Sequence, residues 1–347
     1  MAIDVREVFF VRAAAAGLTR TQETTMRCAI TGALSYTGRY LAARLLAKGH
    51  DVLNLSRRAT PIALAPLSQR QADALAADRV ALDFDDVDAM ARALEGCDVV
   101  YCSHWVRFVA GDGDPHAAAA AANGRLFAAA KRAGVAKVVL MSHTRTSTSS
   151  PFPYIAGKAK AEDLLREADV NYAIARPCGI FGDTPEESIL MNNAAWVLRR
   201  VPVFLVAGDG DHVFQPVHVR DAAALLEALG DPATTGEERD ACGPDAPTSL
   251  ELFGALRDAV GGPGVVVPAR GLLSTRAITA LTRPIDWYTG DTLLDADDLD
   301  LLTSGLTRAD DPDDPAIAGR RSLLAWIADR GPDLGRRYAS SVARYYR

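Results

Sequence analysis

The fold is decided by residues 27–40, which read Arg27-Cys28-Ala29-Ile30-Thr31-Gly32-Ala33-Leu34-Ser35-Tyr36-Thr37-Gly38-Arg39-Tyr40. An apolar run ends at Gly32, and a helix-like pattern with apolar residues on one face begins a few positions later. Gly32 lets the chain turn sharply, and Gly38 lets a helix pack closely against a strand. Taken alone, the pattern also fits an ordinary tight turn, so the rest of the chain must separate the two interpretations.

The functional interpretation of this stretch is a dinucleotide-binding loop. N–H groups at the start of a helix bind the pyrophosphate of such a ligand. The usual fingerprint has a middle glycine, and here Ser35 stands in its place. The loop residues that we expect to contact the cofactor are Gly32, Ser35, Tyr36, Thr37 and Gly38.

The composition excludes several other classes of protein. The 347 residues are 49% hydrophobic and 24% charged, which is typical of a globular protein. The formal net charge is −6 with no long basic run, so we expect no nucleic-acid partner. No apolar run reaches the length of a membrane span. Five scattered cysteines and six histidines without ligand spacing favour a reducing, cytoplasmic location and no metal site.

Strand-like and helix-like runs alternate through the first half of the chain. Short apolar strands separated by amphipathic helices predict parallel βαβ units and an α/β fold with a doubly wound parallel sheet. After the opening unit, the expected strands are 51–56, 79–83, 98–102, 137–141 and 171–175, and the clearest helices are 87–94, 116–133 and 154–168.

Three regions follow from this alternation. Residues 1–25 are expected to be a flexible extension, with a targeting role as the alternative, and residues 26–176 the nucleotide-binding domain. Residues 177–347 are expected to form a smaller, mixed substrate-side lobe that ends in C-terminal helices. Within that lobe we expect a strand at 213–219 and helices at 221–229 and 249–260.

The residues that follow the second and third expected strands are predicted to bind the adenosine half of the cofactor, because ligands bind at the carboxyl ends of such strands. An arginine pair after Ser56 suits the 2′-phosphate of NADP, where an NAD site usually has a carboxylate. We therefore favour NADP(H) over NAD(H), although a surface arginine pair would look the same. The residues concerned are Ser56, Arg57, Arg58, Asp83 and Phe84.

The residues after the fourth strand would pass beside the cofactor. Ser103 is expected to contact it, and His104, Trp105 and Arg107 could face a substrate or simply pack on the rim. Polar residues of the second lobe are further substrate candidates: Asn192, for which a solvent face is the alternative explanation, and Gln215 and His218 at a strand end.

The fifth strand is followed by a pattern with catalytic chemistry. Tyr154 and Lys158 are four residues apart and so share one face of a helix. A lysine ammonium near a phenol favours the phenolate, which suits general acid–base catalysis. A hydroxyl from Ser142 or Thr144 could hydrogen-bond the reacting oxygen.

At this point the chain resembles the short-chain dehydrogenase/reductase superfamily in its extended or atypical branch. It is similar to NAD-dependent epimerase/dehydratases and, more distantly, to the nucleotide-binding accessory subunit of respiratory complex I. The motifs that carry the resemblance are Thr31-Gly32-Ala33…Gly38-Arg39-Tyr40, Ala130–Val135, Tyr154…Lys158, Ala175-Arg176-Pro177…Phe181-Gly182 and Gln215–Asp221.

The resemblance implies a Rossmann sheet, an NAD(P) cofactor, Tyr154 as acid/base and Lys158 on the ribose and phenol. It also implies that the segment from Pro177 to Ile180 lines the nicotinamide. The expected function is an NAD(P)-dependent oxidoreductase or epimerase acting on an alcohol or carbonyl of a small metabolite. The alternative is a non-catalytic NADP(H)-binding subunit of a larger assembly. A homodimer is compatible with either, and the sequence does not identify the substrate.

Overall fold

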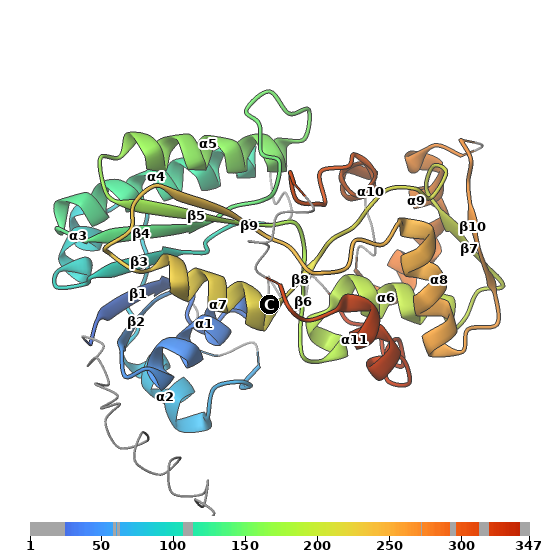
Figure 1. Cartoon of the computed structure of the whole chain (residues 1–347), viewed down its shortest axis with the longest axis horizontal. Helices are drawn as coiled ribbons and strands as arrows, with labels where there is room; N and C mark the ends of the chain where they lie inside the picture. Colours follow the sequence, from blue (N-terminus) through green and yellow to red (C-terminus); the bar gives the residue numbers. More distant parts are fainter. Residues whose placement is uncertain are drawn as a thin grey trace, which may run out of the picture.

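The computed structural model describes residues 25–57, 60, 63–106, 114–271, 273–291, 296–311 and 319–340 (Figure 1). Nearly all of the expected N-terminal extension, together with Arg58 and Arg107, lies outside these residues.

A six-stranded parallel sheet forms the centre of the larger lobe, with strand order β2-β1-β3-β4-β5-β9. This confirms the α/β, doubly wound architecture. The strands are β1 (Arg27–Thr31), β2 (Asp51–Leu55), β3 (Val99–Cys102), β4 (Lys137–Met141), β5 (Tyr172–Pro177) and β9 (Glu237–Ala241).

Helices cover both faces of this sheet, three on each side (Figure 1). Neighbouring strand residues such as Ala29 and Ile30 point to opposite faces, yet both are fully buried. One face packs against α1 (Tyr36–Ala47), α2 (Gln69–Ala77) and α7 (Val219–Leu229). The other packs against α3 (Val87–Leu94), α4 (Pro115–Arg132) and α5 (Pro153–Glu167).

The strand expected at 79–83 is wrong. Only Val80 pairs with the sheet, as an isolated bridge to Leu55. Its N–H donates to Asn54 O and its carbonyl accepts from Ser56 N, after which the chain turns at Asp83, whose Oδ1 accepts from Asp85 N. The sequence analysis also missed α2, although Ser68 and Gln71 form a capping box at its start.

The smaller lobe is built mainly from helices packed on one apolar cluster. Leu252, Leu256, Leu323 and Ile327 are buried there, together with Phe181. Its helices are α6 (Ile189–Leu198), α8 (Ser249–Val260), α9 (Thr275–Thr289), α10 (Ala296–Thr303) and α11 (Leu323–Arg330), preceded by a 3-10 turn at Pro185–Glu187.

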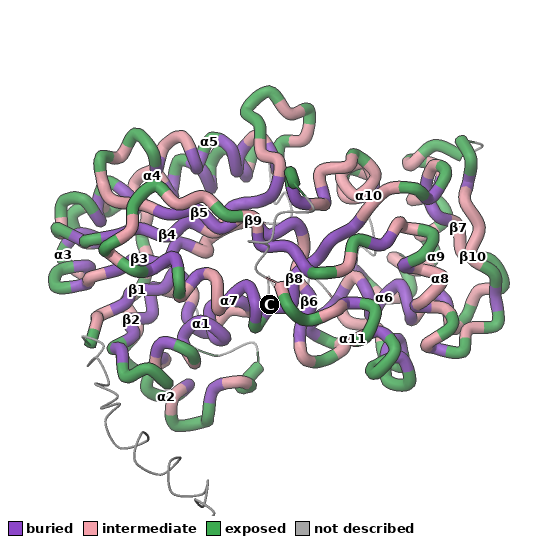
Figure 2. Tube along the Cα trace, in the orientation of Figure 1, coloured by how far each residue is buried: buried purple, intermediate pink, exposed green. Residues whose placement is uncertain are grey.

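Two short parallel pairs complete this lobe: β6 (Ile180–Phe181) with β8 (Val217–His218), and β7 (Val203–Val206) with β10 (Val265–Pro268). The strand expected at 213–219 is therefore shortened to β8. The chain after Pro177 also returns to the large sheet, because α7 and β9 pack there (Figure 2).

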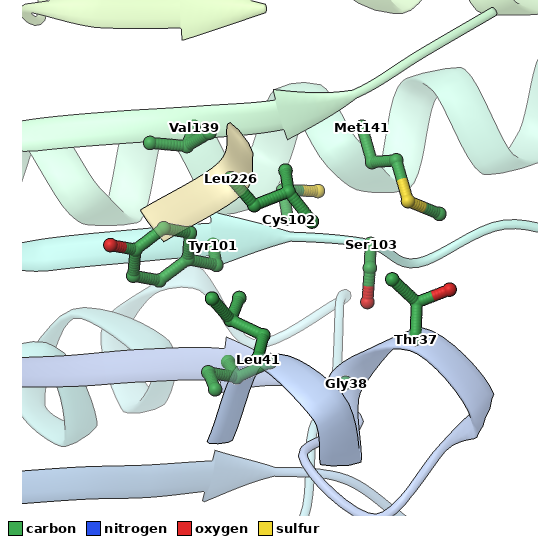
Figure 3. Close-up of a pocket in the computed structure, with 10 residues that line it drawn as sticks. Thr37, Gly38, Leu41, Tyr101, Cys102, Ser103, Val139, Met141 and Leu226 are labelled. Atoms are coloured by element: carbon green, nitrogen blue, oxygen red, sulfur yellow. The ribbon is translucent and has the colours of Figure 1, made fainter. Parts of the chain in front are cut away.

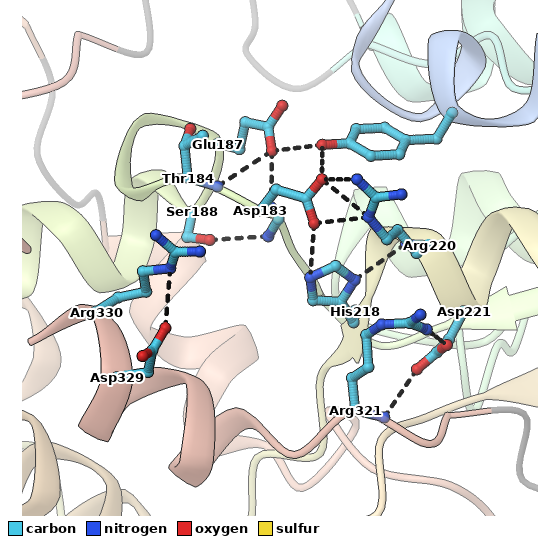
Figure 4. A network of polar contacts seen from close by, with 12 residues as sticks. Asp183, Thr184, Glu187, Ser188, His218, Arg220, Asp221, Arg321, Asp329 and Arg330 are labelled. Atoms are coloured by element: carbon cyan, nitrogen blue, oxygen red, sulfur yellow. Dashed lines mark hydrogen bonds and ion pairs between the residues drawn. The ribbon is translucent and has the colours of Figure 1, made fainter. Parts of the chain in front are cut away.

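A network of ion pairs and hydrogen bonds, largely buried, connects α1 to the smaller lobe. Arg39, fully buried, pairs with Glu187, and the Tyr40 hydroxyl lies 2.8 Å from the same carboxylate. Tyr40 also hydrogen-bonds Asp183 at 3.0 Å, and Asp183 pairs with Arg220 at 2.5 Å (Figure 4). Burial works to raise the pKa of Asp183, but hydrogen bonding and charge from Arg220 hold it below its ordinary value.

The close packing at Gly38 can be tested by replacing this glycine with alanine, which adds one methyl group. A Cβ at Gly38 would lie 2.0 Å from the Gly32 carbonyl oxygen, so Gly38→Ala must push α1 away from β1. We expect a loss of about 1–3 kcal/mol of stability, measured by urea unfolding.

Gly254→Ala is the matched control, because a Cβ added at this position of α8 would have no atom within 4 Å apart from its chain neighbours and the backbone of its own helix. That variant should gain about 0.5–1 kcal/mol, as expected for alanine replacing glycine within a helix. Equal stabilities for the two variants would contradict the close approach at Gly38.

Candidate functional site

The loop that is expected to bind phosphate lies between β1 and α1. Gly32 has φ +79°, which glycine adopts without strain, and Ala33 N donates to the Asn54 side chain at 3.0 Å. Ser35 is the N-cap with φ −78°, so this position does not require glycine, and its hydroxyl makes no capping hydrogen bond. The first turn of α1 also carries no acidic residue, which leaves its amides suited to an anion.

Among the other helices of residues 26–176, three show the contrast, whereas α5, which follows Phe152, also lacks a side-chain cap. Side chains cap α2, α3 and α4, through Ser68, Asp86 and Asp114. The lack of a side-chain cap on α1, despite a serine at its N-cap, is the local feature expected of a helix whose amides receive a diphosphate.

Two residues of the expected adenosine side, Phe84 and Arg57, lie close to the substrate candidate His104. The rings of Phe84 and His104 are 4.6 Å apart, and Arg57 is exposed nearby. Burial lowers the pKa of His104 to about 4, with the positive charges of Lys158 and Arg57 acting in the same direction. Asp83 is exposed at the turn described above, and Ser56 directly follows β2, where its N–H donates to Val80 O.

Ser103 joins the ends of β1 and β3. Its hydroxyl donates to Thr31 O at 2.7 Å, and its N–H donates to Thr31 Oγ1 at 2.8 Å. A cavity of about 10 Å³ lies below this junction, lined by Thr37, Met141 and apolar residues of α1, β3 and α7 (Figure 3). That volume holds one water at most, so the cavity is a packing gap rather than a ligand site.

Tyr154 and Lys158 lie in successive turns of α5, beside the ends of β3 and β4. Lys158 is almost fully buried, and its Nζ donates to Met141 O at 2.9 Å. The same Nζ is 4.1 Å from the centre of the Trp105 ring and 5.9 Å from that of Tyr154. Burial lowers the pKa of Lys158 to about 7, and Cys102 and Glu162 oppose that shift.

Three rings surround Tyr154 edge-on. Their centres lie 6.1 Å (Trp105), 5.5 Å (His116) and 5.6 Å (His143) from the Tyr154 ring. The sequence analysis did not select His116 or His143 for the site. His116 approaches because Gly157 has no side chain, and a Cβ there would lie 2.9 Å from His116 Cβ.

Burial keeps both of these imidazoles neutral at pH 7. It lowers the pKa of His143 to about 4 and lowers that of His116, with Lys158 contributing in each case. Nothing in the sequence marked His116, which begins an alanine-rich helix. His143 stands directly between the two candidate hydroxyl residues, and that position was a usable signal.

The two candidate hydroxyls differ in their surroundings. Thr144 Oγ1 donates to Leu306 O at 2.8 Å. Ser142 is 2% exposed and its hydroxyl makes no well-formed hydrogen bond among the described residues. It lies near Glu162, where burial raises the carboxyl pKa but Arg176, helped by Ser142, brings it below its ordinary value.

The expected substrate residues of the smaller lobe bind protein groups. Asn192 accepts from Gly335 N and donates to Arg337 O. Gln215 accepts from Ala309 N and donates to Gly243 O. His218 accepts from Arg220 N and lies 3.4 Å from Asp183 (Figure 4).

Pro177 and Ile180 both lie at the junction of the two lobes. Pro177 ends β5 opposite Ala241, and Ile180 pairs with Val217. Ile180 is partly exposed, while Cys178 between them is buried against Cys242, with 3.8 Å between the two Sγ atoms.

Two further findings concern the described part of the chain. It contains no helix with the length and apolar character needed to cross a bilayer. Within the same residues, no three His, Cys, Asp or Glu side chains gather as metal ligands.

Sequence comparison identifies an NAD(P)H-binding domain in residues 32–195. An uncharacterized protein of Mycobacterium tuberculosis is 32% identical over 203 residues, which are 58% of this chain and 20% of that protein. The chain thus spans only about a fifth of that relative. Subunit 9 of the NADH dehydrogenase (ubiquinone) 1 alpha subcomplex from Dictyostelium discoideum is 28% identical over 249 residues, covering 69% of this chain and 65% of the subunit.

Solved structures show the same fold at low identity. Triphenylmethane reductase from Citrobacter sp. superposes with a TM-score of 0.66 at 16% identity, covering 88% of this chain and 99% of the reductase. The NADPH-dependent quinone oxidoreductase of Escherichia coli gives 0.64 at 22% identity, covering 87% of this chain and 99% of that enzyme. Residues 32–195 therefore match an NAD(P)H-binding family, and most of the chain shares the fold of these two reductases.

Proposed function

We propose that this chain is an NADP(H)-preferring oxidoreductase or epimerase acting on an alcohol or carbonyl group of a small metabolite. The observation that carries the proposal is the placement of Tyr154 and Lys158 on one side of α5, beside the strand ends that follow the phosphate-binding loop. The reductase and epimerase neighbours support the same class of chemistry.

The residues present fit a nicotinamide dinucleotide. The uncapped start of α1 would hold the diphosphate, and Arg57 would meet a 2′-phosphate. Lys158 would hydrogen-bond the ribose, and Pro177 and Ile180 would line the nicotinamide. When bound, the nicotinamide gives or accepts the hydride.

Tyr154 is the proposed acid/base. In the reductive direction its phenol gives a proton to the substrate oxygen, and in the oxidative direction its phenolate takes one. The charged form of Lys158 stabilises that phenolate, because an opposite charge nearby favours ionisation. Of the two candidate hydroxyls, we favour Ser142 for the reacting oxygen, because the Thr144 hydroxyl already donates to Leu306 O.

We propose a substrate that carries less charge than a sugar nucleotide diphosphate. A sugar nucleotide would need cationic partners for its diphosphate, and two candidate arginines of the smaller lobe already interact with other protein groups. Arg199 donates to Leu334, Val260 and Gly331 carbonyls, and Arg200 stacks on Trp196 with its Cζ 4.2 Å from the ring centre. Asn192 and Gln215 also hydrogen-bond protein groups, so we propose that they support the site and do not contact the substrate.

We also propose a reducing, cytoplasmic environment, because all five cysteines are buried and free. For the oligomeric state we propose a homodimer. A groove of about 940 Å³ runs along α4 and α5 and is bordered by small residues such as Ala117, Ala121 and Ala128.

The proposed catalytic role is tested with Tyr154→Phe. Removing the phenolic hydroxyl removes the proton donor, so kcat should fall at least about 100-fold in a panel of alcohols and carbonyl compounds with NADP(H). Tyr172→Phe, on β5, is the control and should keep wild-type activity. Unchanged kcat in Tyr154→Phe would remove Tyr154 from the mechanism.

The same panel of alcohols and carbonyl compounds distinguishes an enzyme from a non-catalytic NADP(H)-binding subunit. Tightly retained NADP(H) in native mass spectrometry, with no turnover of any compound, would favour the non-catalytic binding protein suggested by the complex I relative.

Cofactor preference is tested with Arg57→Ala. Losing a charge-assisted contact to the 2′-phosphate should weaken NADPH binding about 10- to 100-fold in calorimetry. NADH affinity should stay within about twofold, and Arg70→Ala, on α2, should change neither. Equal weakening of both cofactors in Arg57→Ala would contradict the assignment.

The buried amine makes stability depend on pH. Lys158 has a pKa of about 7 in the folded protein against an ordinary value of 10.5. Between these values the unfolded chain binds more protons, so stability should rise with pH by up to about 1.4 kcal/mol per unit.

Lys158→Met should flatten that rise in urea unfolding series between pH 7 and pH 10. Lys160→Met removes an exposed amine of the same helix and should keep the wild-type slope. A wild-type slope in Lys158→Met would show that this amine does not titrate in the window.

A further inference from the structure

The outward side of α9 is unusually apolar for a surface helix. Trp287 is 88% exposed, Tyr288 77% and Leu281 60%. Single exposed apolar residues are ordinary, but three large ones within eight positions of one helix form a patch.

Two arginines lie in line with Trp287, about 100° around the helix from Leu281 and Tyr288. Arg276, Ala280, Arg283 and Trp287 follow one another at intervals of four, three and four residues, so they form one stripe along the helix. All four side chains are exposed. Arginine and large apolar residues are thus presented together.

Packing within the protein does not explain this composition. Every residue of α9 is described, and of these Ile278 alone is buried, in contact with the small cluster of Ala207, Ala269 and Leu299. Serine or lysine on the outward side would satisfy that packing equally well.

The stripe itself carries two cations and no carboxylate, opposite in sign to the whole chain, although α10, which packs against α9, carries Asp297, Asp298 and Asp300. Exposed Arg270, Arg276 and Arg283 lie in a segment, residues 270–290, whose single carboxylate is the partly buried Asp286. The chain as a whole carries −6. A cationic patch on an acidic protein gives that protein a defined orientation toward an anionic surface.

We propose that the outward side of α9 docks on a bilayer that contains anionic phospholipid. Trp287, Tyr288 and Leu281 enter the boundary between headgroups and acyl chains, where aromatic side chains are favoured, and Arg276 and Arg283 contact lipid phosphates. A helix that presents two arginines and Trp287 on one stripe, with Leu281 and Tyr288 beside it, matches a plane of phosphates above an apolar layer.

This docking is compatible with the rest of the molecule. The helix lies at the opposite end from β1–β4, so a bilayer there leaves the start of α1 accessible (Figure 1). The inference is independent of the proposed activity, because no residue of α9 belongs to the candidate site.

The test is flotation of the full chain with vesicles of equal phosphatidylglycerol and phosphatidylcholine, and with phosphatidylcholine alone. We expect binding to the anionic vesicles, accompanied by a blue shift of tryptophan emission, and at least about tenfold weaker binding to the neutral ones. Trp287→Ser/Tyr288→Ser and Arg276→Ser/Arg283→Ser should each weaken anionic binding by about tenfold or more.

The control is Arg70→Ser/Arg92→Ser, which removes two exposed cations from α2 and α3 and should bind vesicles like the wild type. Thermal unfolding and NADPH affinity, measured for every variant, separate loss of docking from misfolding and from failure of the cofactor site. The proposal is overturned if no vesicle binds, or if the aromatic substitutions leave binding intact. It is likewise overturned if they abolish a dimer in solution instead, since the patch would then serve a second copy.

Discussion

The close approach of α1 to β1 at Gly38 is the constraint on which the candidate site depends. A methyl group at this position would overlap the Gly32 carbonyl, so only a glycine lets the helix begin directly over the turn. That contact aims the first amides of α1 at the edge where the strands end. Because β3 and β4 end at the same edge, the candidate acid/base residues on α5 come into reach of the same ligand.

The parts of the fold that the sequence predicted best carry their own local signals. Residues 87–94 and 249–260 form the expected helices, and each starts at a side-chain cap, Asp86 or Thr248. The strand expected near Val80 failed because it would lie at the outer edge of the sheet, and only one residue pairs there. Apolar character alone does not reveal how many ladder hydrogen bonds an edge segment makes.

The candidate site was predictable where residues follow one another along an element. Spacing places Tyr154 and Lys158 together on a helix, whereas His116 reaches Tyr154 only because α4 packs against Gly157. Asn192 and Gln215 look like cleft residues in sequence. In the structure they satisfy backbone groups of Gly335, Arg337, Gly243 and Ala309, and a sequence does not show which of those groups lack a partner.

The pairing of Arg39 with Glu187 has a consequence for how the chain matures. The two residues are 148 positions apart, and the guanidinium is completely enclosed. Without the segment that carries Glu187, the Arg39 guanidinium lacks its counter-charge, and packing α1 into its final place is less favourable. The start of α1 is therefore expected to reach its final packing only after Glu187 has left the ribosome.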